Sequence, residues 1–147
     1  DLYCGAGTIG ISVADRARRV IGIEIVPEAV RCAKRNAEVN CLTNTSFYCG
    51  DASDTEKLLA TAEAAEGTIF PDVVIIDPPR KGTTPELIGF LARREVPAIV
   101  YVSCDPDTLA RDCALFRRAG YTIGEVTPVD LFPRTGHVEN VVRLSRE

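Results

Sequence analysis

The chain of 147 residues lacks the features that mark membrane proteins and structural metal sites. No apolar run approaches the roughly 18–20 residues of a membrane span, and no signal peptide is recognisable, so we expect no membrane partner. The six cysteines contain no Cys-x-x-Cys pair, and the single histidine completes no zinc-like spacing with them. We therefore expect no bound metal and a cytoplasmic protein with reduced thiols.

The chain also has no excess of positively charged residues. The net charge of −4 argues against a dedicated nucleic-acid-binding surface over the whole chain. The C-terminal half is nevertheless richer in cations than the N-terminal half. Seven of its side chains are candidates for a phosphate-facing patch, although a solvated surface is the simpler interpretation: Arg80, Lys81, Arg93, Arg94, Arg117, Arg118 and Arg134.

Short apolar runs alternate with amphipathic stretches along the whole chain, without an internal repeat or a linker. The predicted strands are 1–3, 19–25, 45–49, 72–77, 97–103, 121–127 and 138–144. The predicted helices are 8–17, 27–40, 54–65, 84–94 and 106–118. This order predicts an α/β, Rossmann-like domain with a doubly wound, mostly parallel sheet. No helix separates the last two strands, so we expect the last strand to be antiparallel.

A glycine loop follows the first strand. Gly5 and Gly7 allow a sharp turn and a close approach to a ligand, and the spacing to Gly10 also fits a dinucleotide loop. Asp1 disfavours a dinucleotide, because a carboxylate lies poorly beside a pyrophosphate and well beside an ammonium group.

Acidic residues end each of the first four predicted strands, at Asp1, Glu24, Asp51 and Asp77. The carboxyl ends of strands form the ligand-binding edge of such a sheet. Glu24 is suited to the hydroxyls of a ribose, and Asp51 to the amino group of an adenine. The set favours a cationic cofactor without phosphates.

Three features of the C-terminal half are candidates for chemistry. Pro78 and Pro79 stiffen the loop after Asp77. Cys104 ends the fifth strand just before a helix, whose dipole favours a thiolate. Glu139 enters the last apolar strand, so it faces either water or a functional cleft. Cys4 lies in the glycine loop, and the remaining cysteines are expected in the core, namely Cys32, Cys41, Cys49 and Cys113.

Six segments together resemble the catalytic domain of the RNA uracil-5-methyltransferases. They are D-L-Y-C-G-A-G-T (1–8), G-I-E (22–24), G-D-A (50–52), D-P-P-R-K-G (77–82), Y-V-S-C-D-P-x-T-L-A-R-D (101–112) and L-F-P-x-T-x-H-V-E (131–139). Asp105 stands where this family usually has asparagine. The resemblance implies a class I methyltransferase fold that uses S-adenosylmethionine, releases S-adenosylhomocysteine, and modifies ribosomal or transfer RNA.

The resemblance also implies roles for individual residues. Cys104 would add to carbon 6 of uracil and Glu139 would remove the proton from carbon 5, while Arg134 and His137 would shape the base pocket. The cofactor would be bound by Tyr3, Gly5, Gly7, Thr8, Glu24, Asp51 and Asp77. We expect residues 1–147 to be a monomeric catalytic domain of a longer protein, with N-terminal RNA-binding regions outside it.

Three alternatives stay open. An RNA cytosine-5 methyltransferase is disfavoured because Arg80 stands where such enzymes carry a second cysteine after proline. A nitrogen methyltransferase would need neither Cys104 nor Glu139, and it would usually have an aromatic residue at position 80. A cofactor-binding, RNA-associated module that is inactive as an isolated fragment is the third alternative.

Overall fold

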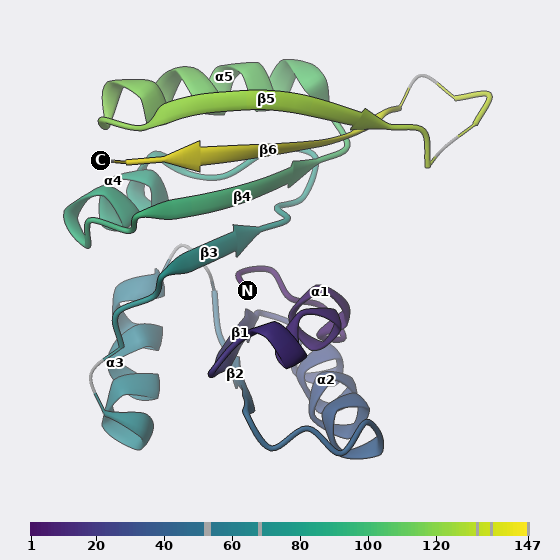
Figure 1. Ribbon diagram of the computed structural model, residues 1–147, viewed down its shortest axis with the longest axis vertical. Helices are drawn as coiled ribbons and strands as arrows, with labels where there is room; N and C mark the ends of the chain where they lie inside the picture. The colour runs from purple at the N-terminus through teal and green to yellow at the C-terminus, as the bar shows by residue number, and fades with distance from the viewer. Residues whose placement is uncertain (52–53, 68, 132, 136, 147) are drawn as a thin grey trace. The chain divides into compact units, whose positions relative to one another are not determined.

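The protein is described from a computed structural model, which covers residues 1–51, 54–67, 69–131, 133–135 and 137–146. Ala52, Phe132 and Gly136, which belong to the motifs above, lie outside the described residues. The chain forms two compact units, Asp1–Ile69 and Phe70–Glu147, and each is considered by itself (Figure 1).

The N-terminal unit is built on parallel strand pairing. Its elements are α1 (Thr8–Ser12), a 3₁₀ turn (Ala14–Arg16), β1 (Val20–Glu24), α2 (Pro27–Val39), β2 (Thr45–Cys49) and α3 (Thr55–Glu66). Strands β1 and β2 pair in parallel from Val20 with Thr45 to Glu24 with Cys49. Leu2 forms a further parallel bridge with Ile23.

Helix α2 packs its apolar face on these strands. Pro27 occupies the first turn, where a missing N–H is tolerated. Small residues at Ala33 and Ala37 let the helix approach closely, and the cluster around them is Cys4, Val30, Ala33, Ala37 and Phe47. This packing fixes the helix that follows β1, and with it the strand end that carries Glu24.

The C-terminal unit mixes parallel and antiparallel pairing. Its elements are β3 (Val73–Ile76), α4 (Pro85–Arg93), β4 (Ala98–Ser103), α5 (Pro106–Arg118), β5 (Thr122–Val129) and β6 (Glu139–Ser145). The strand order is β3-β4-β6-β5, with β3 parallel to β4 and β6 antiparallel to both of its neighbours (Figure 1). The α/β alternation and the antiparallel last strand are therefore confirmed.

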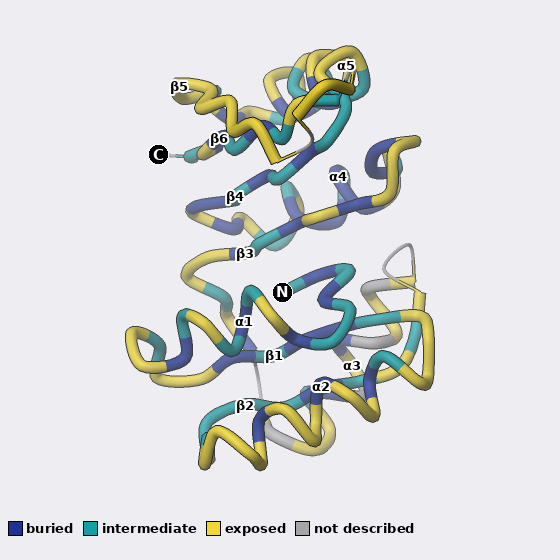
Figure 2. The backbone as a smooth tube through the Cα atoms, turned by 90° about the vertical axis from the view of Figure 1, so that its right-hand side faces the viewer, coloured by how far each residue is buried: buried dark blue, intermediate teal, exposed yellow. Residues whose placement is uncertain are grey.

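Burial differs strongly between the strands of this unit. Figure 2 shows β4 mostly dark blue and teal, and β5 mostly yellow. The central strand β4 supplies Ile99 and Tyr101, both 0% exposed. Helix α5 contributes Phe116, which contacts the rings of Tyr101 and Tyr121 edge-to-face. Helix α4 adds the buried Leu87 and Leu91, so the core of this unit is formed by β4 together with α4 and α5.

The structure corrects three local expectations. The first predicted helix ends at Ser12 and a 3₁₀ turn replaces its second half. The predicted first strand is a single bridge at Leu2, because Tyr3 turns to a positive φ of 63°. Cys32, Cys41 and Cys49 are exposed rather than buried, since they lie on the outer face of α2, in the turn after it and at the end of β2.

None of the helices in the described part of the chain has the length and apolar character that a membrane crossing requires. Across the same described ranges, no three His, Cys, Asp or Glu side chains gather as metal ligands would.

Candidate active site

The glycine loop of the N-terminal unit begins beside β1, after the bridge between Leu2 and Ile23. The N–H of Ile23 donates to Asp1 O at 2.8 Å, and the N–H of Cys4 donates to Ile23 O at 3.0 Å. The chain then turns so tightly that the N–H of Gly7 reaches Cys4 O at 2.8 Å. Gly5 and Gly7 both have positive φ angles, 53° and 80°, which explains glycine at both positions.

The two glycines differ in the space around them. Among the described residues other than its chain neighbours, no atom lies within 4 Å of a Cβ built on Gly5, so this part of the backbone leaves room for a ligand. A Cβ on Gly7 would lie 3.0 Å from the Phe47 ring and 3.1 Å from the Ala33 Cβ. Gly7 therefore serves the packing of the loop, while Gly5 leaves the surface that a ligand can approach.

The Glu24 carboxylate is hydrogen-bonded to the backbone of the glycine loop. Its Oε2 accepts the N–H of Gly5 at 3.0 Å, and its Oε1 accepts the N–H of Val26 at 2.9 Å. Each carboxylate oxygen has a second lone pair, so the group can still accept two hydroxyl hydrogens. The N–H of Gly50 donates to Glu24 O at 2.9 Å, which brings the predicted Asp51 to the same end of the strands.

Other predicted residues of this loop also have defined surroundings. Tyr3 is half-buried, and Thr8 is exposed at the start of α1. Asp1 accepts the N–H of Gly10 at 2.9 Å through Oδ2. Its other oxygen, Oδ1, is buried and has no hydrogen-bond partner among the described residues. A buried acceptor without a partner is suited to a donor from a ligand.

Cys4 is a core residue rather than a second nucleophile. It is buried against α2, and burial raises the pKa of its thiol to about 11. A thiol with such a pKa stays protonated near neutral pH, and the thiolate is the nucleophilic form.

The C-terminal unit gathers three predicted residues at one sheet edge. Asp77 follows β3 directly, and Cys104 follows β4, which is parallel to β3. Glu139 begins β6, whose last residue pair with β4 is Ser103 with Asn140. Cys104 and Glu139 are the residues that adjoin this last pair, Cys104 in the bend just after β4 and Glu139 at the start of β6.

The charges of this edge influence one another. Glu139 is half-buried, and burial followed by the negative charge of Asp77 raises the pKa of its carboxyl above the usual value. Asp77 is an exposed residue, but partial desolvation of its carboxyl raises its pKa as well. Two carboxyls with raised pKa values at one edge are typical of acid–base sites.

The helix after Cys104 is capped by its neighbour. The Asp105 carboxylate accepts the N–H of Thr108 at 2.8 Å, and this hydrogen bond, with a smaller contribution from the charge of His137, lowers the pKa of Asp105. Ser103 Oγ contacts both the N–H and the carbonyl of Asp105, at 3.2 and 3.0 Å. These bonds fix the backbone on both sides of Cys104. Arg134, by contrast, is exposed on the loop before β6.

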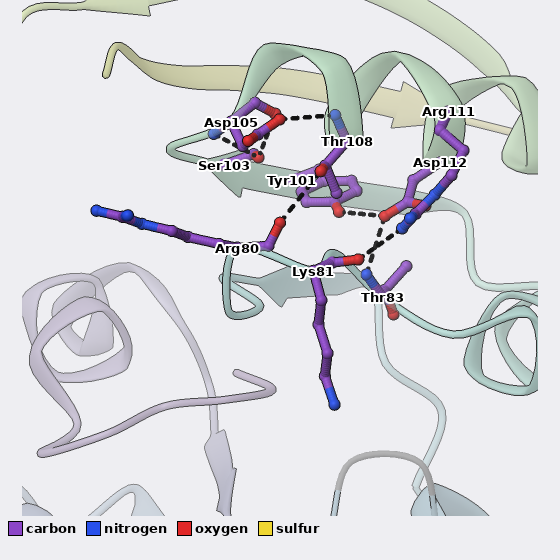
Figure 3. A network of polar contacts seen from close by, with 9 residues as sticks. All are labelled: Arg80, Lys81, Thr83, Tyr101, Ser103, Asp105, Thr108, Arg111 and Asp112. Atoms are coloured by element: carbon purple, nitrogen blue, oxygen red, sulfur yellow. Dashed lines mark hydrogen bonds and ion pairs between the residues drawn. The ribbon is translucent and has the colours of Figure 1, made fainter. Parts of the chain in front are cut away.

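Asp112, which was not a candidate from the sequence, joins the loop after Asp77 to α5. Asp112 is 0% exposed and accepts hydrogen bonds from Tyr101, Thr83 and Arg111 (Figure 3). A signal was available, because position 112 lies on the same helical stripe as the buried Leu109 and Phe116. A charged residue on a buried stripe requires partners.

The structural comparisons identify the class of protein first. The chain superimposes on a precorrin-6Y C5,15-methyltransferase of Geobacter metallireducens with a TM-score of 0.70 at 18% identity, covering 99% of this chain and 78% of that one. It superimposes on the Pyrococcus abyssi tRNA (uracil-54, C5)-methyltransferase, solved with S-adenosyl-L-homocysteine, with a TM-score of 0.81 at 37% identity. That match covers 98% of this chain and 33% of that one. The fold is that of the class I methyltransferases.

The family follows from the sequence. The family model described as tRNA (uracil-5-)-methyltransferase matches residues 1–147, and the chain belongs to this family. An uncharacterized RNA methyltransferase of Clostridium acetobutylicum is 45% identical over 146 residues, which are 99% of this chain and 31% of that protein. One from Enterococcus faecalis is 47% identical over 146 residues, with the same coverages. The chain thus spans about a third of the length of these curated relatives.

Proposed function

We propose that residues 1–147 form the catalytic domain of an S-adenosylmethionine-dependent RNA uracil-5-methyltransferase. The observation that carries the proposal is the register of β4 and β6, which ends at the pair of Ser103 with Asn140, so that the adjoining Cys104 and Glu139 lie at the same strand ends. Carbon 5 of uracil is a weak nucleophile, so a thiol that can add to the ring next to a carboxylate that can take a proton is the required pair.

Each protein group has a defined part in the reaction. The Cys104 sulfur forms a bond to carbon 6, and the electrons of the 5,6 double bond move into an enolate, which makes carbon 5 nucleophilic. When bound, S-adenosylmethionine supplies a methyl group from its cationic sulfur to that carbon. Glu139 then takes the proton from carbon 5, the double bond re-forms, and the bond between sulfur and carbon 6 breaks to restore the thiolate.

The residues of the N-terminal unit fit this cofactor. Glu24 keeps two acceptor positions for a ribose, and the open backbone of Gly5 admits a close ligand. The unpaired, buried Oδ1 of Asp1 fits a cationic ligand. Tyr3, Gly7, Thr8, Asp51 and Asp77 complete the proposed set, and carboxylates are suited to a cofactor that carries positive charge and no phosphate.

We also propose the setting of the enzyme. Its substrate is a uridine of transfer or ribosomal RNA. All six cysteines are free, which supports a reducing compartment, the cytoplasm. We expect a monomer, which sedimentation of the purified protein tests.

Methyl transfer to RNA by the full-length protein tests the proposal. Radioactive S-adenosylmethionine should label RNA at carbon 5 of uridine, and Cys104→Ala should abolish the labelling. Cys113→Ala is the matched control, because Cys113 is a half-buried thiol on α5. Normal labelling by Cys104→Ala would overturn the mechanism, and a label on cytidine carbon 5 would overturn the choice of base.

A further inference from the structure

The loop after Asp77 is tied to α5 through its backbone rather than through its own side chains. Arg80 O accepts the Thr108 hydroxyl at 3.1 Å, and Lys81 O accepts an N–H of the Arg111 guanidinium at 2.7 Å. The N–H of Thr83 donates to Asp112 Oδ2 at 2.9 Å. Figure 3 shows these contacts between the loop and one face of α5, with the Arg80 and Lys81 side chains extending away from the network.

Asp112 is the centre of this network. The Tyr101 hydroxyl donates to its Oδ2 at 2.6 Å, and Nε and an NH₂ group of Arg111 donate to its Oδ1 at 2.9 and 2.8 Å. Burial, and then Asp112, raise the pKa of Tyr101, so its hydroxyl stays protonated and donates. A fully buried carboxylate is stable only when its oxygens are satisfied in this way.

The loop depends on these contacts because it is poor in donors of its own. Pro78 and Pro79 have no backbone N–H. The N–H of Gly82 donates to Pro79 O at 2.8 Å within the turn, so it is not available to α5. Gly82 has a φ of 78°, and a Cβ there would collide with Asp112, Thr108 and Arg111. Glycine at position 82 therefore allows the loop to pack closely on α5.

We propose that Asp112 is a positioning residue of the uracil-methylating site. Through Thr83, Tyr101 and Arg111 it fixes the loop that leads from Asp77 relative to the helix that follows Cys104. The inference rests on the proposed function, since it concerns the geometry between Asp77 and the nucleophile. Asp77 and Cys104 end adjacent parallel strands, but the loops that follow these strands decide how the two side chains are directed.

A displacement of about 1 Å in a catalytic group can lower a rate by roughly a hundredfold without weakening binding. Loosening this network should therefore lower kcat while the KM for RNA stays nearly constant. A residue that only stabilises the fold would instead lower the amount of folded protein and leave kcat per folded molecule unchanged.

Two buried tyrosines provide a matched test. Tyr101 and Tyr121 both pack edge-to-face on Phe116, and each donates one hydroxyl hydrogen bond, Tyr101 to Asp112 and Tyr121 to Leu91 O at 3.2 Å. In the full-length protein, Tyr101→Phe should lower kcat for methyl transfer about tenfold and Tyr121→Phe less than about twofold. Equal effects of the two substitutions on kcat would overturn the proposal.

Asp112→Asn keeps the shape of the side chain but turns an amide N–H₂ towards donors. Its kcat should fall about tenfold to a hundredfold with a KM for RNA within about threefold of the original. Amide hydrogen exchange at Thr83 should accelerate in Asp112→Asn and Tyr101→Phe, and not in Tyr121→Phe. Unchanged exchange at Thr83 in both variants would contradict the proposal.

The two claims fail in different ways. If the unsubstituted protein methylates no uridine, the proposed function fails, whereas the exchange measurement still tests whether Asp112 holds the loop. If the unsubstituted protein is active and Tyr101→Phe keeps its full kcat, the positioning role alone is overturned. Since Tyr101→Phe removes a single hydroxyl, the test stands even if Asp112→Asn does not fold.

Discussion

Cys104 and Glu139 flank the last residue pair of the antiparallel ladder between β4 and β6, which joins Ser103 to Asn140. The two residues are far apart in the sequence and become neighbours only because β6 inserts between β4 and β5. In the proposed reaction, a planar base would meet the sulfur from one strand end and the carboxylate from the next. The proposed reaction needs this proximity, because one group adds to carbon 6 and the other removes a proton from carbon 5.

The acid limb of the pH–rate profile should report Glu139. Its carboxyl acts as a base only when ionised, and its pKa lies above the usual 4.5. The rate should thus be full above the raised pKa and fall as the pH drops through it. Because the Asp77 charge contributes to the shift, Asp77→Asn should move the midpoint of the limb to lower pH, even if the maximal rate is small. A midpoint that stays in place or rises would contradict this electrostatic coupling.

The control is Glu125→Gln on the exposed strand β5. This substitution should leave the midpoint of the acid limb unchanged.

Glu24→Gln should weaken the binding of S-adenosylmethionine about tenfold to a hundredfold, as expected for the loss of hydrogen bonds to a charged group. The amide N–H₂ would also face the N–H of Gly5 or Val26, which now donate to the two carboxylate oxygens. Isothermal titration calorimetry measures the affinity. Glu28→Gln is a suitable control, because Glu28 forms an exposed ion pair with Arg31 on α2. Equal affinities of the two variants would remove Glu24 from the proposed cofactor site.

Substitutions at Gly5 and Gly7 should have different effects on the free energy of unfolding and on the affinity for the cofactor. Gly7→Ala should lower the free energy of unfolding by about 2–4 kcal/mol, because a left-handed backbone and contacts with Phe47 and Ala33 both oppose a Cβ. Gly5→Ala should lower it by only about 1–2 kcal/mol, since the described part of the chain puts no atom within 4 Å of its Cβ apart from the adjoining residues, but should weaken cofactor binding. Urea unfolding without ligand, combined with calorimetry, measures both effects. The opposite order of stabilities would contradict the packing described here.

Much of the fold could be predicted from local pattern. Pro106 in the first helical turn and the acidic Asp105 and Asp107 beside it predict a helix over 106–118, and α5 has these bounds. The antiparallel last strand follows from the missing helix between 121–127 and 138–144, and β5 and β6 pair in this way.

Other features depend on contacts between distant residues. The helix predicted over 8–17 stops at Ser12, and Asn44 donates to the carbonyls of Ala14 and Ala17 at 2.8 and 2.9 Å. No local pattern shows that a side chain thirty residues away will satisfy these carbonyls. The helical stripe of Leu109 and Phe116 indicates that position 112 is buried, but it does not show which groups satisfy the Asp112 carboxylate. Its burial follows from the loop that packs on α5.

Cys104 and Glu139 were both candidates from their places at predicted strand ends. Their proximity could not be derived from the sequence alone, because it depends on the strand order β4-β6-β5 and on the register of the pairing. Their roles in catalysis remain predictions.

The most direct test of this account is the intact mass of Glu139→Gln after incubation with S-adenosylmethionine and uridine-containing RNA. Without the base, the proton at carbon 5 should stay in place, so the protein should accumulate as a covalent adduct with methylated RNA. Digestion should locate the bond at Cys104. Free protein alone, or an adduct attached to another cysteine, would contradict the proposed pairing of the two residues.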